Sequence, residues 1–266
     1  EVDQEDFLCP VENGEITLRS YRAPELGDKV TDALIYFHGG GWTAGGLESH
    51  EANCRFLANE AKITVIAVDY RLAPEFKFPI PLEDSITALN FICENNRLFK
   101  IDPMRIILAG DSAGGQIATI LAHQYSEELP AQGEVIAEIL FYPSTDLTLS
   151  FKSYQRIDRG FPVNGKSVRE FRAAYLTGEE DLTDPRLSPL LNNQLNRHLH
   201  TFIITVGLDP LVDEGIAYAQ KLREERLFVQ HYHIPNQPHD FLAYSGLIPT
   251  GKEYLKKAAY FIRTLR

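Results

Sequence analysis

Short apolar runs alternate with longer amphipathic segments along most of the chain. The run at 63–68 is continuous and rich in β-branched residues, as expected for a strand that is buried on both faces. The segment 81–94 has a helical pattern with proline at its first position. Similar patterns predict strands at 16–21, 33–37, 105–109, 135–142, 202–206 and 228–234, and helices at 48–61, 114–125, 251–265 and up to residue 222. This alternation predicts an α/β fold, with helices on both faces of a mostly parallel central sheet.

One long stretch between the predicted strands at 135–142 and 202–206 breaks the alternation. It has roughly sixty residues, whereas compact α/β connections usually need about 2–6 besides their helix. It contains an amphipathic pattern at 166–176 and turn signals at 184–185 and 188–189. We expect about residues 146–190, the cap segment, to form a helical cap over the carboxyl edge of the sheet, where ligands bind in open α/β folds. The short N-terminal arm, 1–14, is a second candidate for the cap. Without repeats or Gly/Ser linkers, we expect one domain over 1–266.

The charge balance excludes some classes of partner. The chain has 26 Lys and Arg against 37 Asp and Glu, which gives a formal net charge of −11. Binding to nucleic acid or to an anionic membrane surface requires clustered basic residues, so neither partner is expected. No apolar stretch reaches the roughly 18 residues that a membrane-spanning helix needs.

The start of the chain and its cysteines point to one compartment. The first six residues are mostly acidic, which does not fit a signal peptide. Cys9, Cys54 and Cys93 are odd in number and form no Cys-x-x-Cys pair, which argues against a disulfide framework or a zinc site. We therefore expect a cytoplasmic protein with three reduced thiols and no metal.

The strongest chemical signal is the sequence GDSAGG at 110–115. It matches G-x-S-x-G and lies between a predicted strand and a predicted helix, which is the context that a nucleophilic serine requires. The turn is so tight that side chains at Gly110 and Gly114 would collide, and the helix directs its positive N-terminus at the site. Ser112 is therefore the predicted nucleophile, although a serine in an ordinary glycine-rich turn would give the same letters.

The second signal is the sequence HGGGW at 38–42, directly after the predicted strand at 33–37. Consecutive glycines let several amide N–H groups face one point, as a tetrahedral oxyanion requires. We name Gly40, Gly41 and Ala113 as the donors and expect His38 to hold the loop that includes Gly39. A flexible turn or a phosphate loop is the alternative, but the spacing matches neither nucleotide-binding pattern.

The acid and the base follow from chain order and strand ends. In this kind of fold the nucleophile is followed by the acid and then by the histidine. Asp209 comes just after the predicted strand at 202–206, whereas Asp213 falls in the following helix. His239 follows the turn after the last predicted strand, so we predict it as the base, and histidines inside that strand are expected to be structural. No histidine has metal-ligand spacing.

Taken together, these motifs resemble the hormone-sensitive-lipase-like branch of the α/β-hydrolases, which consists mostly of bacterial carboxylesterases. HGGGW and GDSAGG carry the resemblance, and DYRLAPE at 69–75, YPSTDL at 142–147 and DPLVDEG at 209–215 agree with it. The likeness runs from about residue 16 to the C-terminus. It implies the α/β-hydrolase fold, selects Asp209 as the acid, and is consistent with a homodimer.

The resulting hypothesis is a serine carboxylesterase that acts on short- to medium-chain acyl esters through a Ser112–Asp209–His239 triad. The substrate is a small-molecule ester, and no cofactor is implied. Trp42, Phe161 and Leu211 are candidates to line the pocket, although ordinary core packing explains them equally well. Asp240 stands where the family usually has glycine, and we expect its carboxylate to point to solvent rather than to raise the pKa of His239.

Two other functions remain open at this stage. An arylformamidase-like amide hydrolase shares the fold and a similar glycine motif. A non-catalytic receptor on the same scaffold, like the plant gibberellin receptors, is less favoured because such receptors lose a triad member, and all three positions are filled here.

Overall fold

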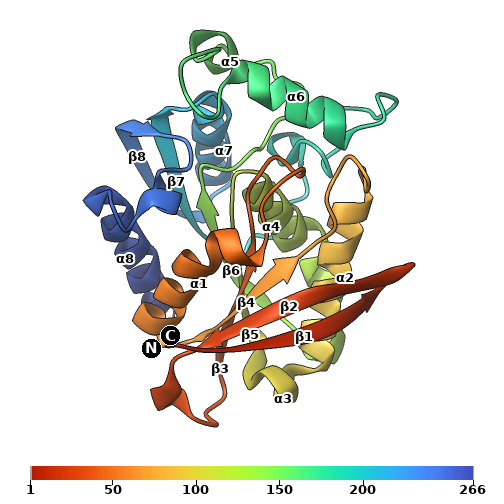
Figure 1. Cartoon of the computed structure of the whole chain (residues 1–266), viewed down its shortest axis with the longest axis vertical. Coiled ribbons are helices and arrows are strands. Elements are labelled where there is room, and N and C mark those ends of the chain that lie inside the picture. The colour runs from red at the N-terminus through yellow and green to blue at the C-terminus, as the bar shows by residue number, and fades with distance from the viewer. Residues whose placement is uncertain (1, 266) are drawn as a thin grey trace.

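One sheet of eight strands organises the computed structural model, which describes residues 2–265 (Figure 1). The strands lie in the order β1-β2-β4-β3-β5-β6-β7-β8. Neighbours pair in parallel from β4 through β3 to β8, and antiparallel pairing is confined to β1 with β2 and β2 with β4. The predicted mostly parallel sheet is confirmed. The strand bounds are β1 Asp3–Val11, β2 Gly14–Arg22, β3 Thr31–Phe37, β4 Thr64–Asp69, β5 Ile101–Asp111, β6 Val135–Phe141, β7 His200–Leu208 and β8 Phe228–Pro238.

The longer helices form two layers, one on each face of the sheet. α1 (Leu47–Ala61) and α8 (Pro249–Thr264) pack together over one face, with a shared apolar cluster beneath them. α2 (Ile80–Glu94), α4 (Ala113–Gln124) and α7 (Val212–Glu224) bury a second cluster against the other face. The shorter helical segments are η1 Pro24–Leu26, α3 Asn96–Phe99, η2 Ser126–Glu128, η3 Pro130–Gln132, η4 Pro189–Leu191 and η5 Phe241–Tyr244.

The continuous apolar run in β4 serves both layers. Ile66 and Val68 belong to the cluster beneath α2 and α4, whereas Val65 and Ala67 belong to the cluster beneath α1 and α8. Successive side chains of a strand point to opposite faces, so a strand that is covered on both sides needs apolar residues at every position. The burial of β4 on both faces therefore explains the continuous apolar pattern at 63–68.

The N-terminal arm corrects one expectation. Residues 3–11 do not join the cap; they form β1, an edge strand that pairs with β2 along its whole length. Cys9 is buried in the core, while most of the acidic residues before it are exposed. The strand was not predicted because its outer positions are charged, as is usual for a sheet edge that must avoid pairing with other chains.

The cap segment carries two helices, α5 (Ser153–Arg156) and α6 (Gly165–Tyr175), which lie together at the top of Figure 1, away from the β1–β2 hairpin. α6 begins where the Asn164 side chain accepts a hydrogen bond from the Ser167 amide, and the Ser167 hydroxyl accepts one from the Asn164 amide. Such a reciprocal cap fixes a helix start. The predicted amphipathic helix at 166–176 is thus present.

Two carboxyl groups of α7, of which that of Glu214 is fully buried, hold the beginning of the cap segment. Glu214 accepts hydrogen bonds from the amide of Thr145, at 2.7 Å, and from the hydroxyl of Tyr154 in α5. Asp213, one residue earlier, accepts from the Ser153 amide at 3.0 Å and pairs with Arg156. The helix that follows Asp209 therefore also positions the segment that passes over the sheet.

Two further observations concern the whole of the described chain. No helix within residues 2–265 is both long enough and apolar enough to cross a membrane. Cys9, Cys54 and Cys93 are all buried as free thiols.

Candidate active site

Ser112 occupies a sharp turn between β5 and α4. Its backbone is in the left-handed region, at φ 54° and ψ −119°, which is strained for a residue with a side chain. The turn closes only because glycines flank it. A Cβ at Gly110 would lie 2.3 Å from the Gly114 backbone, and one at Gly114 would lie 2.0 Å from the carbonyl oxygen of Phe37. At Gly110 this is the predicted collision across the turn, whereas Gly114 is required by the close approach of the backbone at the end of β3.

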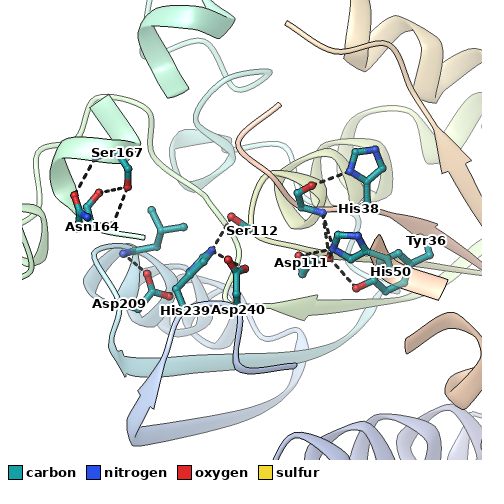
Figure 2. Close-up of polar contacts among 12 residues, drawn as sticks. Tyr36, His38, His50, Asp111, Ser112, Asn164, Ser167, Asp209, His239 and Asp240 are labelled. Carbon is teal, nitrogen blue, oxygen red and sulfur yellow. Dashed lines mark hydrogen bonds and ion pairs between the residues drawn. The ribbon is translucent and has the colours of Figure 1, made fainter. Parts of the chain in front are cut away.

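A continuous chain of hydrogen bonds links the three predicted triad residues (Figure 2). The Nε2 atom of His239 lies 2.9 Å from the Ser112 Oγ, and its Nδ1 lies 2.8 Å from Oδ2 of Asp209. Asp209 follows the end of β7 and His239 follows the end of β8, so parallel strands bring both to one sheet edge. The other oxygen of Asp209 accepts from the Leu211 amide at 2.8 Å, which fixes the carboxylate.

The surroundings of His239 stabilise its charged form. Burial alone would lower the pKa of His239, but the carboxylates of Asp209 and Asp240 outweigh this and raise it to about 9. The ring also packs against Tyr142, with 4.7 Å between ring centroids. Asp209 therefore both orients the ring and favours its protonated form.

The glycine loop after β3 lies across from Ser112. Gly40, Gly41 and Ala113 line the same cavity as Ser112 and His239. Between residues 2 and 265, the amide N–H groups of Gly40 and Gly41 donate no hydrogen bond, so both are free to bind a ligand oxygen. Gly41 has φ +61°, and a Cβ on it would lie 2.4 Å from the ring of Phe171 in α6. The loop and the cap segment are therefore in direct contact.

The buried carboxylate of Asp111 holds this loop by a hydrogen bond. Asp111 accepts hydrogen bonds from the Tyr36 hydroxyl at 2.8 Å and from the Gly39 amide at 3.1 Å, and it pairs with His50 at 3.1 Å (Figure 2). Burial would raise the pKa of Asp111, but the His50 contact lowers it below its usual value. Asp111 therefore fixes the residue that directly precedes Gly40.

His38 lies at the start of the loop and contacts it by a hydrogen bond. Its Nδ1 donates to the Gly39 carbonyl at 2.7 Å, its ring stacks on Tyr70 at 4.3 Å, and its own carbonyl accepts from the Tyr70 hydroxyl at 2.6 Å. Burial lowers the pKa of His38 to about 4, so the ring is neutral at ordinary pH.

The cavity in front of Ser112 is small, about 80 Å³. Of the three candidate pocket residues, Trp42 and Leu211 line this cavity, whereas Phe161 does not. The apolar wall from the cap segment consists instead of Val163, Val168 and Phe171. Phe161 lies just before α6, where only its carbonyl accepts from the Asn164 side chain. Two of the wall residues, Val168 and Phe171, lie on α6, and Val163 directly precedes the residue that caps the helix.

Three contributors were absent from the sequence hypothesis. Asp111 occupies the first of the two variable positions of G-x-S-x-G, and the motif itself gives no reason to select it. His50 has a side chain that is only 15% exposed and pairs with Asp111. Asp240 was expected to point to solvent, but Oδ1 lies 3.5 Å from Nε2 of His239. Among residues 2–265, no group of His, Cys, Asp and Glu side chains is placed to share a metal ion.

Known proteins share this fold. A family described as having the alpha/beta hydrolase fold matches residues 34–243. An ethyl acetate hydrolase from Pseudomonas putida is 37% identical over 244 residues, which are 90% of this chain and 76% of that protein. An ester hydrolase from the metagenome of Lake Arreo, solved with a bipyridine phosphonate derivative, superposes with a TM-score of 0.90 at 34% identity, covering 99% of this chain and 82% of that one. A hyperthermophilic esterase from Pyrobaculum calidifontis gives 0.91 at 31% identity, with 99% and 86% covered.

The chain therefore belongs to the α/β-hydrolase family. The family match spans the strands that carry the glycine loop, Ser112, Asp209 and His239. The resemblance noted in the motifs is confirmed.

Proposed function

We propose that the protein is a serine carboxylesterase that hydrolyses short- to medium-chain acyl esters, with Ser112 as nucleophile, His239 as base and Asp209 as acid. The observation that carries the proposal is the unbroken hydrogen-bond chain from Asp209 through His239 to Ser112, ending at a cavity with free amide donors. The names of the relatives, an ethyl acetate hydrolase among them, support ester hydrolysis.

The chemistry follows from the positions of these groups. Nε2 of His239 takes the hydroxyl proton as the Ser112 Oγ attacks the ester carbonyl carbon. The amide N–H groups of Gly40, Gly41 and Ala113 stabilise the oxygen that becomes negative. The imidazolium then gives its proton to the leaving alcohol. Water hydrolyses the acyl-enzyme by the same steps and regenerates Ser112.

The size and lining of the cavity favour short acyl groups. Pockets that enclose drug-sized ligands have roughly 300–1,000 Å³, whereas this cavity has about 80 Å³. Its walls are largely apolar, because Val163, Val168 and Phe171 face it from the cap segment. We propose that residues 146–190 act as a cap that limits how long an acyl chain the site accepts.

Ser112→Ala tests the mechanism directly. We expect hydrolysis of p-nitrophenyl butyrate to fall by roughly 10⁴- to 10⁶-fold, because no other group replaces the nucleophile. Ser126→Ala is the matched control, since Ser126 follows the opposite end of α4 and hydrogen-bonds only to Asn196. Equal activity of wild type and Ser112→Ala would refute the triad.

A chain-length series of p-nitrophenyl esters, from acetate to decanoate, tests the substrate range. Activity should be highest for the shorter acyl groups and fall steeply once the chain exceeds the cavity. N-formylkynurenine belongs in the same series. Faster turnover of this amide than of every ester would favour the arylformamidase reading instead.

A further inference from the structure

Asp240 lies at the mouth of the cavity, directly beside the reacting groups. Its backbone is left-handed, with φ +63°, and this turn directs the side chain back over the ring of His239 (Figure 2). Oδ1 of Asp240 lies 3.5 Å from Nε2, the nitrogen that also contacts Ser112. The Asp240 side chain is 39% exposed, whereas that of His239 is 2% exposed. A substrate that enters from solvent therefore meets the Asp240 carboxylate before it meets His239.

Apart from the His239 ring itself, no positive side chain of the described cavity wall balances this carboxylate. Among the described residues that line the cavity, the ionisable ones are Asp240 and His239, and none is Lys or Arg. Two more carboxylates, Asp111 and Asp209, lie near enough to act on Asp240. Burial, together with these two neighbours, raises the pKa of Asp240, while the charges of His239 and His50 oppose the rise. Negative charge is therefore concentrated on one side of the site.

The position of this charge relative to Nε2 decides which part of an ester meets it. After attack by Ser112, Nε2 must donate its proton to the oxygen of the departing alcohol. That oxygen therefore comes within hydrogen-bond reach of Nε2, where the Asp240 carboxylate already lies. The alcohol portion of the ester passes next to Asp240, while the acyl portion remains on Ser112 with its oxygen toward the glycine loop.

Building on the esterase function, we propose that Asp240 is a specificity-determining residue that rejects esters whose alcohol portion carries a negative charge and admits neutral or cationic ones. Two like charges a few ångströms apart near a protein surface repel strongly, although water at the half-exposed mouth weakens the effect. An effect of about tenfold on kcat/KM is expected in low salt.

The test is a pair of acetate esters that differ in the charge of the alcohol portion. 4-Acetoxybenzoate is anionic at about pH 8, and methyl 4-acetoxybenzoate is its neutral counterpart. The variant is Asp240→Asn, because asparagine tolerates the left-handed backbone at this position and keeps the side-chain shape. The ratio of variant to wild-type kcat/KM for each ester removes differences in leaving-group reactivity.

We expect Asp240→Asn to raise kcat/KM for the anionic ester about tenfold relative to the neutral ester. Glu253→Gln, an exposed carboxylate of α8 outside the site, changes the net charge equally and should leave that ratio unchanged. For the wild type alone, about 0.5 M salt should reduce the difference in kcat/KM between the anionic and the neutral ester. The inference would be overturned if Asp240→Asn changed kcat/KM equally for both esters. It would also be overturned if salt left the wild-type difference in kcat/KM between the two esters unchanged.

The two proposals fail in different ways. If the wild type hydrolyses neither ester, the esterase function itself is wrong. If it hydrolyses the neutral ester and Asp240→Asn alters both rates alike, only the charge selection is wrong.

Discussion

Each ring nitrogen of His239 has a carboxylate beside it. Asp209 binds Nδ1 at 2.8 Å, as a triad requires, and Asp240 lies 3.5 Å from Nε2. Both favour the protonated ring, and with the neighbouring Asp111 they raise the pKa of His239 to about 9 against the opposing effect of burial. Only the neutral ring can accept the proton of Ser112. In the proposed mechanism, the free enzyme must therefore lose a proton from His239 before Ser112 can react.

This requirement predicts the acidic limb of the pH profile. Because the pKa is raised, kcat/KM should still be rising with pH well above the ordinary histidine value of about 6.5, by up to tenfold per pH unit. Asp240→Asn should move this limb to lower pH, since one stabilising charge is lost. The measurement is kcat/KM for a neutral ester across pH at constant ionic strength. A limb that stays in place in the variant would show that Asp240 does not act on the base.

The candidate site residues that could be selected from the sequence share one property. Each is marked by a local feature of the chain. Ser112 is marked by flanking glycines, and Asp209 and His239 by the strand ends that they follow. Asp240 and His50 could not be found in this way. The direction of the Asp240 side chain depends on a left-handed backbone, and the burial of His50 depends on Asp111, which is 61 residues away in the chain.

Between elements, α6 and the glycine loop approach each other closely at the site. A side chain at Gly41 would overlap the Phe171 ring. We therefore expect Gly41→Ala to displace the loop and lower kcat roughly 10²-fold, the effect of losing one oxyanion donor. In a Phe171→Ala background the added methyl group has room, so the same change should cost less than about tenfold. Equal losses in both backgrounds would mean that α6 does not press on the loop.

The elements themselves were predicted best where they are buried. The run at 63–68 matched a strand covered on both faces, and the pattern at 166–176 matched α6. β1 was missed because its exposed side is acidic and its pairing with β2 is a property of the sheet rather than of residues 3–11. Phe161 was misplaced because the inner face of α6 could not be assigned before its position over the site was known.

For the whole molecule, the buried carboxyl group of Glu214 links stability to pH. Burial raises its pKa to about 8, although three hydrogen bonds to its oxygens oppose the rise. The folded chain therefore binds this proton more tightly than the unfolded chain, in which the pKa is near 4.5. Between these two values the free energy of unfolding should fall as pH rises, by at most about 1.4 kcal/mol per pH unit from this group.

Glu214→Gln tests this linkage, because the amide resembles the protonated acid and keeps an oxygen for the Thr145 amide. Urea unfolding at about pH 5 and about pH 8 should show a smaller loss of stability in the variant than in the wild type. Glu224→Gln, on the exposed side of the same helix, should retain the wild-type dependence. Parallel pH dependence in wild type and Glu214→Gln would mean that Glu214 is ionised in the folded protein.

The chain contains a single tryptophan, and its position gives the molecule a built-in optical reporter. Trp42 follows the glycine loop, its ring stacks on Tyr175 at the end of α6 with 4.6 Å between centroids, and its Nε1 donates to Gln116 of α4 at 3.0 Å. Indole emission therefore comes from one ring at the junction of loop, cap segment and nucleophile helix. A shift in wavelength would report the separation of these parts while ester turnover is followed in the same cuvette.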